Sequence, residues 1–180
     1  MTSHSTDKRN SPSSASAADF DRLGLSDVML ASLARAAYLE PTPVQAGIIP
    51  RALAGNDVLG QARTGTGKTA AFAIPIIERL KHGGKNSSPR ALVLVPTREL
   101  AVQVRDEFEK LAHGRRLTCV PIYGGKPIRG QIAKLQCGAD VVIGTPGRIL
   151  DHMGRASLDL RAVQIVVLDE ADRMLDIGFR

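Results

Sequence analysis

The sequence predicts an α/β fold in which a parallel sheet carries helices on both faces, and three observations lead to it. Short apolar runs alternate with stretches in which apolar residues recur at helical spacing. Aromatic residues make up only 3% of the chain and tryptophan is absent, so Ala, Val, Ile and Leu must build the core, which suits buried parallel strands. A glycine-rich loop follows the first apolar run and leads into a helical pattern. Strand and helix in alternation indicate a sheet covered on both sides.

Length and composition indicate one domain preceded by a tail. The 180 residues suffice for a single α/β domain with a sizeable core. Residues 1–18 are rich in Ser, Ala and Thr and show no periodic apolar pattern, so we expect a disordered tail followed by a domain over residues 19–180. The net charge of +6 allows a polyanionic partner, although simple solubility would also account for it.

The location predicted from the sequence is cytoplasmic. No apolar run approaches the ~18 residues that a membrane-spanning helix needs, and no secretory signal is visible. The two cysteines do not form a disulfide framework or a zinc motif, so we expect both to be reduced. We expect a monomer that does not contact a membrane.

Two helices are predicted before the glycine-rich loop. Ser26 can cap the first helix, whose apolar face includes Leu33, and the turn at residues 41–43 ends it and starts the second. Gly55 is placed to end the second helix. Pro50 lies inside it and predicts a kink or an early break.

Five strands are predicted, each followed by a segment of helical periodicity or by polar residues. The intervening segment 100–111, for example, has apolar residues every three or four positions. In parallel sheets, ligands bind beyond the carboxyl ends of the strands, so the residues after each strand are the candidates for function. The predicted strands are residues 58–61, 91–95, 118–123, 141–144 and 165–168.

The loop after the first predicted strand has the composition of a phosphate-binding loop. Gly65 and Gly67 allow successive backbone N–H groups to converge on one anion. Lys68 adds a mobile positive charge, and Thr69 supplies a hydroxyl suited to Mg²⁺. The helix expected to begin here directs the positive end of its dipole toward the phosphates.

One position of this loop departs from the P-loop pattern. Ala62 stands where that pattern opens with a glycine. A glycine- and threonine-rich turn that caps an ordinary helix is therefore the alternative interpretation, and the rest of the chain has to decide between the two.

Carboxylates follow the last predicted strand, at the same edge of the sheet as Lys68. Asp169 is placed to hold the Mg²⁺ of a nucleotide, directly or through water. Glu170 could then orient and deprotonate the water that attacks the γ-phosphate. Acidic residues that complement a helix N-terminus are the alternative explanation.

Residues 169–172 read Asp-Glu-Ala-Asp, and together with the glycine-rich loop they resemble the motifs of the DEAD-box RNA helicases. The resemblance covers residues 20–180 and implies a RecA-like P-loop domain. Its further motifs occur in the expected order: YLEPTPVQ (38–45, Q motif), ARTGTGKT (62–69, motif I), PTRELA (96–101, motif Ia), Gly124-Gly125 (GG element) and TPGR (145–148, motif Ib).

The resemblance implies ATP and Mg²⁺ as cofactors. Lys68, Asp169 and Glu170 would be catalytic, and Thr69 and Asp169 would hold the Mg²⁺, partly through water. The remaining contacts to the nucleotide would come from Ala62, Arg63, Thr64, Gly65, Thr66, Gly67, Lys68 and Thr69.

An adenine site upstream is also implied by the resemblance. Gln45 would hydrogen-bond to the adenine edge, Tyr38 would stack on its face, and Phe20 would support that pocket. Judged from the residues alone, Gln45 would be a polar side chain on an otherwise packed helix.

RNA is the partner that the resemblance implies, through contacts to the backbone that do not depend on base sequence. Taken singly, Arg98 would be an ordinary exposed arginine and Thr145 a helix cap. Asp172 would couple this domain to a second one. The implied RNA-binding residues are Pro96, Thr97, Arg98, Gly124, Gly125, Thr145 and Arg148.

Two positions differ from the family pattern. Ala37 stands where the Q motif usually opens with glycine, and Arg63 stands where many relatives have glutamine. We expect mild effects, with Ala37 in a backbone conformation open to a β-carbon.

The chain stops at Arg180, whereas the family continues with an SAT motif and a second RecA-like domain that carries arginine fingers. We therefore expect a sheet that is incomplete at its C-terminus. The chain alone should bind nucleotide weakly and should not unwind duplexes, although the full-length protein would couple ATP hydrolysis to local RNA unwinding. The alternative is a catalytically silent fragment that binds RNA or a partner. A P-loop ATPase acting on something other than RNA is disfavoured by the acidic tetrad together with Gln45.

Overall fold

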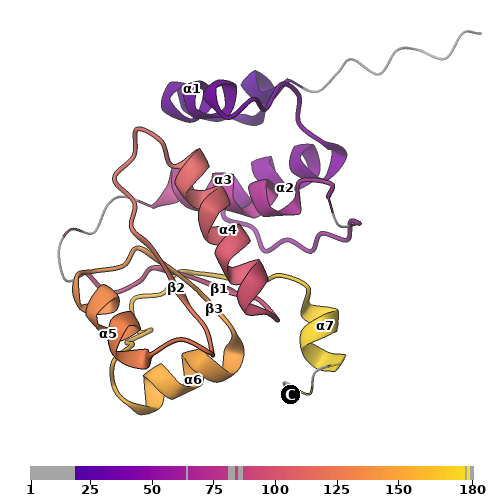
Figure 1. The fold of residues 1–180 in the computed structure, drawn as a ribbon. Helices are drawn as coiled ribbons and strands as arrows, with labels where there is room; N and C mark the ends of the chain where they lie inside the picture. The colour runs from indigo at the N-terminus through magenta and orange to yellow at the C-terminus, as the bar shows by residue number, and fades with distance from the viewer. Residues whose placement is uncertain (1–18, 64, 81–83, 85–86, 177, 179–180) are drawn as a thin grey trace, which may run out of the picture.

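A four-stranded parallel sheet forms the centre of the chain (Figure 1). The computed structural model describes residues 19–63, 65–80, 84, 87–176 and 178, so the tail expected over residues 1–18 lies outside the described part. The spatial order of the strands is β2-β3-β1-β4. The strands are β1 (Ala91–Leu94), β2 (Cys119–Ile122), β3 (Val141–Gly144) and β4 (Ile165–Leu168).

The register of the sheet brings all four carboxyl ends to one edge. Gly144 at the end of β3 pairs with both Ile122 of β2 and Leu94 of β1, and Leu94 also pairs with Leu168 of β4. Residues that follow different strands therefore become neighbours. The peptide N–H of Asp169, for instance, donates to the carbonyl of Leu94 at 3.0 Å.

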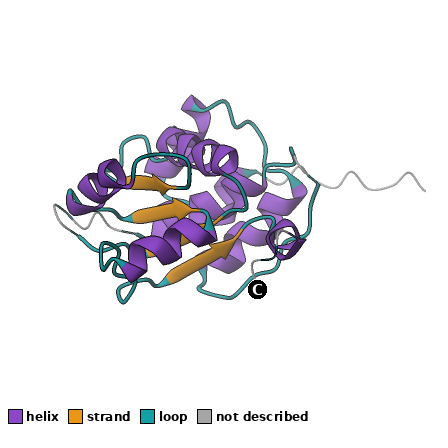
Figure 2. Cartoon of the chain, turned by 60° about the horizontal axis from the view of Figure 1, so that its bottom comes forward, coloured by secondary structure: helices purple, strands orange, loops and turns teal. Residues whose placement is uncertain are grey.

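Helices cover both faces of this sheet, as predicted (Figure 2). Val93 and Ile143 face the larger core, which contains the buried residues of α3 and α4. Their strand neighbours Leu92 and Val142 face the opposite way, toward Ile149 of α6. The helices are α1 (Asp27–Arg35), α2 (Pro43–Leu53), α3 (Lys68–Arg79), α4 (Arg98–Leu111), α5 (Ile128–Gln136), α6 (Pro146–Gly154) and α7 (Ala171–Asp176), preceded by a 3-10 turn over Phe20–Leu23.

Side-chain caps fix where several helices begin. The hydroxyl of Ser26 accepts from the N–H of Met29 and starts α1, as predicted. Thr42 caps α2, and Thr97 caps α4 by accepting from the N–H of Leu100 at 3.2 Å. None of the helices in the described part of the chain is long and apolar enough to cross a membrane.

The first predicted strand does not form, which corrects the prediction for residues 58–61. These residues have no regular secondary structure, and Val58 and Leu59 are 40% and 100% exposed. An apolar run becomes a strand only where a neighbouring backbone satisfies its N–H and C=O groups. In the described structure β4 pairs with β1 alone, and no strand pairs with residues 58–61.

Two backbone expectations about the N-terminal helices were also wrong. Of the kink or early break predicted at Pro50, the break does not occur, because the second helix continues to Leu53. Ala37 does not have a conformation that residues with a β-carbon adopt freely, because its φ of 60° lies in the left-handed region that favours glycine. The Schellman-type end at Gly55, with a φ of 87°, agrees with the prediction.

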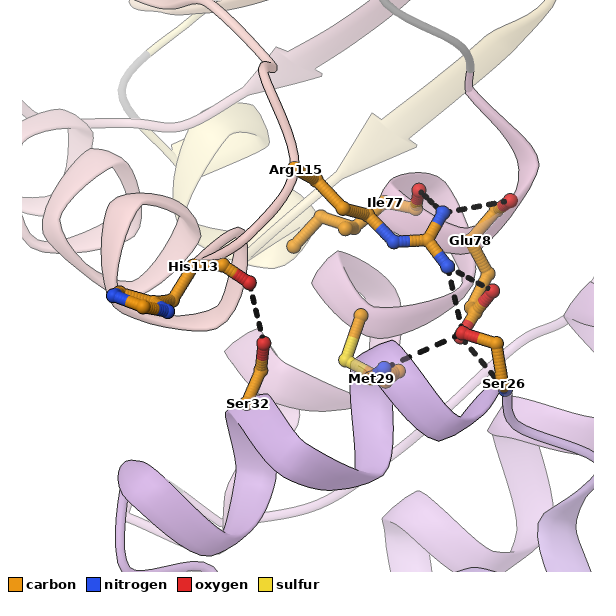
Figure 3. Close-up of polar contacts among 7 residues, drawn as sticks. All are labelled: Ser26, Met29, Ser32, Ile77, Glu78, His113 and Arg115. Carbon is orange, nitrogen blue, oxygen red and sulfur yellow. Dashed lines mark hydrogen bonds and ion pairs between the residues drawn. The ribbon is translucent and has the colours of Figure 1, made fainter.

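A polar cluster attaches α1 to the body of the domain (Figure 3). Arg115, in the segment after α4, donates through Nη2 to Glu78 at the end of α3 and to the hydroxyl of Ser26, both at 2.7 Å. The Ser26 hydroxyl in turn donates to Glu78 at 2.7 Å. Further along α1, Ser32 donates to the carbonyl of His113 at 2.7 Å. The N-terminal helix is thus held by hydrogen bonds as well as by its apolar face.

Candidate functional site

Two glycines of the glycine-rich loop have backbone conformations in the left-handed region. Gly65 and Gly67 have φ values of 83° and 84°, and α3 begins directly afterwards at Lys68. The hydroxyl of Thr66 donates to the carbonyl of Arg63 at 2.8 Å and so closes the turn. Thr64 lies outside the described residues. The two glycines therefore occupy conformations that other residues would adopt only with strain, as the sequence predicted.

Gln45 connects α2 to this loop. Its side chain is 1% exposed; Nε2 donates to the carbonyl of Gly67 at 3.1 Å, and Oε1 accepts from the N–H of Thr42 at 2.9 Å. The approach to the loop is close, because a Cβ on Gly67 would lie 2.3 Å from that same Nε2. Gln45 thus fixes both the start of α2 and the turn before Lys68.

Lys68 and Asp169 line the same cavity, which has a volume of about 470 Å³ and lies between α2, α3, residues 55–60 and β4. Asp169 is 9% exposed, and this burial raises the pKa of its carboxyl, whereas the positive charge of Lys68 acts in the opposite direction. Two residues that are distant in the sequence therefore interact electrostatically at the carboxyl edge of the sheet, as predicted.

Glu170 has an unusual backbone conformation. Its φ is 53°, and its Oε2 forms an ion pair with Nη1 of Arg173 at 2.7 Å. A non-glycine residue held in this region is a strained feature of the kind that clusters at functional sites. Asp172, assigned to interdomain coupling, is exposed at the start of α7.

Tyr38 and Phe20 lie against each other, with ring centroids 6.3 Å apart and planes at 79°. The hydroxyl of Tyr38 donates to Glu107 of α4, and burial together with this contact raises the pKa of Tyr38. Nζ of Lys110 lies 4.9 Å from the centroid of the Tyr38 ring. Sequence reasoning missed Glu107 and Lys110, although their spacing of three residues places them on one face of α4.

Three loops meet at the carboxyl ends of β1, β2 and β3, and we call them the three-loop edge: residues 96–98, 124–126 and 145–148. A Cβ added to Gly125 would lie only 3.2 Å from Nη1 of Arg98. The guanidinium of Arg98 therefore packs against the second loop. Arg148 reaches the same loop from the third, donating through Nη1 to the carbonyl of Lys126 at 3.1 Å. The predicted residues of motifs Ia, GG and Ib are therefore brought together.

Individual residues of the three-loop edge differ in how accessible they are. Arg98, Gly124 and Gly125 are exposed, whereas Pro96 is buried and shapes the loop from beneath. In the part of the chain that the structure describes, the hydroxyl of Thr145 makes no capping hydrogen bond to α6. Thr145 nevertheless occupies the N-cap position of α6, with Pro146 next in the chain, so it begins the helix by its backbone conformation and leaves its hydroxyl uncommitted to the cap.

Comparison with known proteins identifies the family. The family model described as DEAD/DEAH box helicase matches residues 42–180, which is more than half of the chain. The chain belongs to the DEAD/DEAH box helicase family. The DEAD-box tetrad is Asp169 to Asp172, as the sequence indicated.

Relatives of known name agree with this assignment. The chain is 51% identical over 160 residues to the DEAD-box ATP-dependent RNA helicase CshA of Geobacillus kaustophilus, which covers 89% of this chain and 34% of that protein. It is also 51% identical over 166 residues to the ATP-dependent RNA helicase DeaD of Mycobacterium tuberculosis, covering 92% of this chain and 29% of the relative. The chain thus spans about a third of the length of these curated DEAD-box relatives.

A solved structure supports the fold. The crystal structure of a DEAD box protein from the hyperthermophile Methanococcus jannaschii superposes with a TM-score of 0.84 at 46% sequence identity, covering 89% of this chain and 44% of that one. The α/β fold with a parallel sheet, predicted from the sequence, is therefore confirmed as that of a DEAD-box protein.

The DEAD-box tetrad and the start of α3 carry oxygen donors of the kind that Mg²⁺ prefers. The described residues include no group of three or more His, Cys, Asp or Glu side chains that could hold an ion by themselves. Thr69 and Asp169 offer a hydroxyl and a carboxylate, which are hard oxygen ligands. Mg²⁺ is commonly bound by one or two such groups, with phosphates and waters completing its shell.

Proposed function

We propose that this chain is an ATP- and RNA-binding domain of a DEAD-box RNA helicase, which in the full-length protein couples ATP hydrolysis to local RNA unwinding. The observation that carries the proposal is the cavity that Lys68 and Asp169 share, with a glycine-rich loop of left-handed φ values at the start of α3. A cation and a carboxylate that line one cavity, next to a glycine-rich loop at the N-terminus of a helix, match the requirements of a nucleoside triphosphate with its metal.

The phosphates would be bound by the loop and by α3. The amides around Gly65 and Gly67 would bind the phosphates together with the positive end of the α3 dipole, and Lys68 would neutralise further charge. Thr69 and Asp169 would hold Mg²⁺, which when bound neutralises charge on the β- and γ-phosphates. The remaining contacts, from Ala62, Arg63, Thr64 and Thr66, would surround the same phosphates.

Glu170 would act as the general base for hydrolysis. Its Oε2 now pairs with Nη1 of Arg173 at 2.7 Å, and the other oxygen of the carboxylate would accept the proton from water. Because Arg173 competes with water for this carboxylate, the ion pair is the observation behind the second candidate, a binding module that is catalytically silent in isolation.

Adenine would be recognised by the Q motif. Gln45 already uses one N–H on Gly67 and one lone pair on Thr42, which leaves a second N–H and a second lone pair for the base. Tyr38 would stack on adenine with Phe20 supporting it. Because Glu107 and Lys110 hold Tyr38 from α4, they would set the orientation of its ring.

RNA would bind along the three-loop edge. Arg98 and Arg148 supply charge, while the N-terminus of α4 and the backbone of Gly124 and Gly125 supply N–H donors that suit phosphates and read no base. Thr97 and Thr145 would add hydroxyl contacts, and Pro96 would shape its loop. Contacts to 2′-OH groups would favour RNA over DNA.

A nucleotide-binding titration tests the first half of the proposal. Calorimetry with a non-hydrolysable ATP analogue and Mg²⁺ should show affinity reduced about tenfold or more for Lys68→Ala, because a buried charge contact to phosphate is lost. Asp169→Asn should abolish the gain in affinity that Mg²⁺ gives. Lys134→Ala, an exposed position on α5, is the matched control and should bind normally. Equal binding by Lys68→Ala and the control would contradict the proposal.

Assays of turnover and of RNA binding test the second half. Filter binding should show tighter binding to single-stranded RNA than to DNA of the same sequence, with affinity that falls as salt rises. RNA-stimulated ATP hydrolysis that Lys68→Ala abolishes would support the enzyme. RNA binding without any such turnover would support the silent module instead.

A further inference from the structure

Two buried polar side chains lie behind the three-loop edge and take no part in the chemistry proposed above. Gln131 of α5 is 7% exposed and His152 of α6 is 0% exposed. They contact each other across the two helices, with Nε2 of His152 lying 3.3 Å from Oε1 of Gln131. A satisfied buried polar pair of this kind fixes one relative placement of the elements that carry it.

The direction of each hydrogen bond follows from the partners. Nε2 of Gln131 donates to the carbonyl of Tyr123 at 3.0 Å, and because a carbonyl only accepts, the amide oxygen of Gln131 must face His152. His152 therefore carries its proton on Nε2 and donates to Gln131. Its Nδ1 then accepts, and lies 2.9 Å from the hydroxyl of Ser157, whose single proton is shared between this nitrogen and the carbonyl of His152 at 3.0 Å.

Both residues of the Gln131–His152 pair are connected to the three-loop edge. Tyr123, whose carbonyl Gln131 holds, directly precedes Gly124 and Gly125. Arg148 lies four residues before His152 on α6, so the two side chains are one helical turn apart. Since Arg148 also donates to the carbonyl of Lys126, the second and third loops are joined twice, at the surface and beneath it.

We propose that Gln131 and His152 are positioning residues for RNA binding, which set the distance between the Gly124-Gly125 backbone and Arg148. Neither side chain touches RNA. A guanidinium and backbone N–H groups bind successive phosphates of one strand only when their spacing matches that strand, and charge-assisted hydrogen bonds weaken rapidly when the geometry is lost. The inference rests on the proposed function, because it assumes that the three-loop edge binds RNA.

The alternative is that the pair only stabilises the core. A purely structural role would lower thermal stability and would affect nucleotide and RNA binding alike. A positioning role changes RNA binding selectively and depends on the hydrogen bond rather than on the volume of the side chains.

Three variants separate these roles. Gln131→Met keeps the approximate volume but removes both hydrogen bonds, and His152→Leu removes the ring nitrogens. His152→Gln is the conservative variant, since its amide can again donate to Gln131. Should His152→Leu fail to fold, Gln131→Met carries the test. Arg148→Ala serves as the control that removes a direct contact.

The first measurement is fluorescence anisotropy with a labelled oligouridylate in the presence of Mg²⁺ and an ATP analogue. Gln131→Met and His152→Leu should bind RNA about threefold to tenfold more weakly, the effect of losing roughly one hydrogen bond to phosphate. Their affinity for the nucleotide should not change, the salt dependence of RNA binding should become shallower, and His152→Gln should restore most of the affinity.

The second measurement needs no RNA. Hydrogen exchange at the amide of Thr145, which donates to the carbonyl of Ile122 at 3.2 Å, should be faster in Gln131→Met than in the unmodified chain, while the amides of β3 keep their protection. Unchanged exchange at Thr145 would overturn the inference, because the Gln131–His152 pair would then not hold the second and third loops together.

The outcomes distinguish this inference from the proposed function. If the unmodified chain binds RNA and Arg148→Ala weakens binding while Gln131→Met and His152→Leu do not, the positioning inference alone is overturned. Parallel loss of Tm, nucleotide affinity and RNA affinity without rescue by His152→Gln overturns it in favour of a structural role. If the unmodified chain does not bind RNA, the proposed function fails and the inference fails with it.

Discussion

The amide nitrogen of Gln45 donates to the carbonyl of Gly67 at 3.1 Å and joins the Q motif to the phosphate-binding loop. The contact leaves no room for a side chain at residue 67, where a Cβ would lie 2.3 Å from Gln45 Nε2. The position of the loop before Lys68 therefore depends on α2 as well as on its own glycines. The proposed adenine and phosphate sites therefore share this contact.

Gly67→Ala should destabilise the domain more than Gly65→Ala. Both glycines have left-handed φ values, so each alanine costs about 1 kcal/mol of backbone strain, but only Gly67 faces an atom that a methyl group would strike. We expect roughly 1 to 3 kcal/mol of further loss for Gly67→Ala because the packed neighbour must move. Urea unfolding of the two variants measures the difference.

A double variant identifies the collision as the cause. Combining Gly67→Ala with Gln45→Ala removes the atom that the new methyl group meets. The double variant should therefore lose less stability than the sum of the losses in the two single variants. Strict additivity, or equal stability of Gly65→Ala and Gly67→Ala, would show that Gln45 does not restrict the loop.

Ala37→Gly should stabilise the domain. Ala37 has a φ of 60° and an exposed methyl group, so glycine relieves strain without leaving a cavity. The relief of about 1 to 2 kcal/mol exceeds the extra chain entropy of glycine, and a net gain of roughly 0.5 to 1 kcal/mol follows. Ala36→Gly is the matched control. Ala36 has a φ of −82°, so glycine relieves no strain there and the variant should lose stability. A loss of stability in Ala37→Gly would show that the backbone at residue 37 is not strained.

Local sequence signals predicted most of the fold. Four of the five predicted strands form, and Ser26, Gly55 and the glycines of the loop act as their types suggest. Each of these features depends on a backbone conformation or a capping hydrogen bond that one residue type provides in almost any fold. Residues 58–61 failed because a strand also needs a partner, and periodicity does not say whether one is present.

The candidate site was predicted as a set of residues but not as a set of contacts. Lys68 and Asp169 were placed together because both were predicted to follow strands of one parallel sheet, and they lie together although the strand predicted before Lys68 does not form. Glu107, Gln131 and His152 were missed, since each contacts a residue distant in the sequence and its own segment looks like an ordinary amphipathic helix. Such pairings are set by tertiary packing, which a single sequence does not encode in any local pattern.

The two cysteines should react with a thiol reagent at very different rates. Burial is the main cause that raises the pKa of Cys119 to about 12, so almost none of it is thiolate at neutral pH, whereas Cys137 is exposed. Ellman's reagent should label one thiol per chain quickly in the native state and both in urea. A Cys137→Ser variant with undiminished fast labelling would contradict this assignment.

Arg115→Met should cost far more stability than Arg161→Met. Arg115 holds the carboxylate of Glu78, whose side chain is 11% exposed, together with the hydroxyl of Ser26, and its loss leaves a largely buried charge without its partner. We expect a loss of about 2 to 4 kcal/mol in urea unfolding. The side chain of Arg161, which pairs with Asp159, is 91% exposed, so its removal should leave stability almost unchanged. Adding Glu78→Gln to Arg115→Met should recover part of the loss, because the unpaired charge is then gone. Similar losses in the two single variants would mean that the cluster does not hold α1 onto α3.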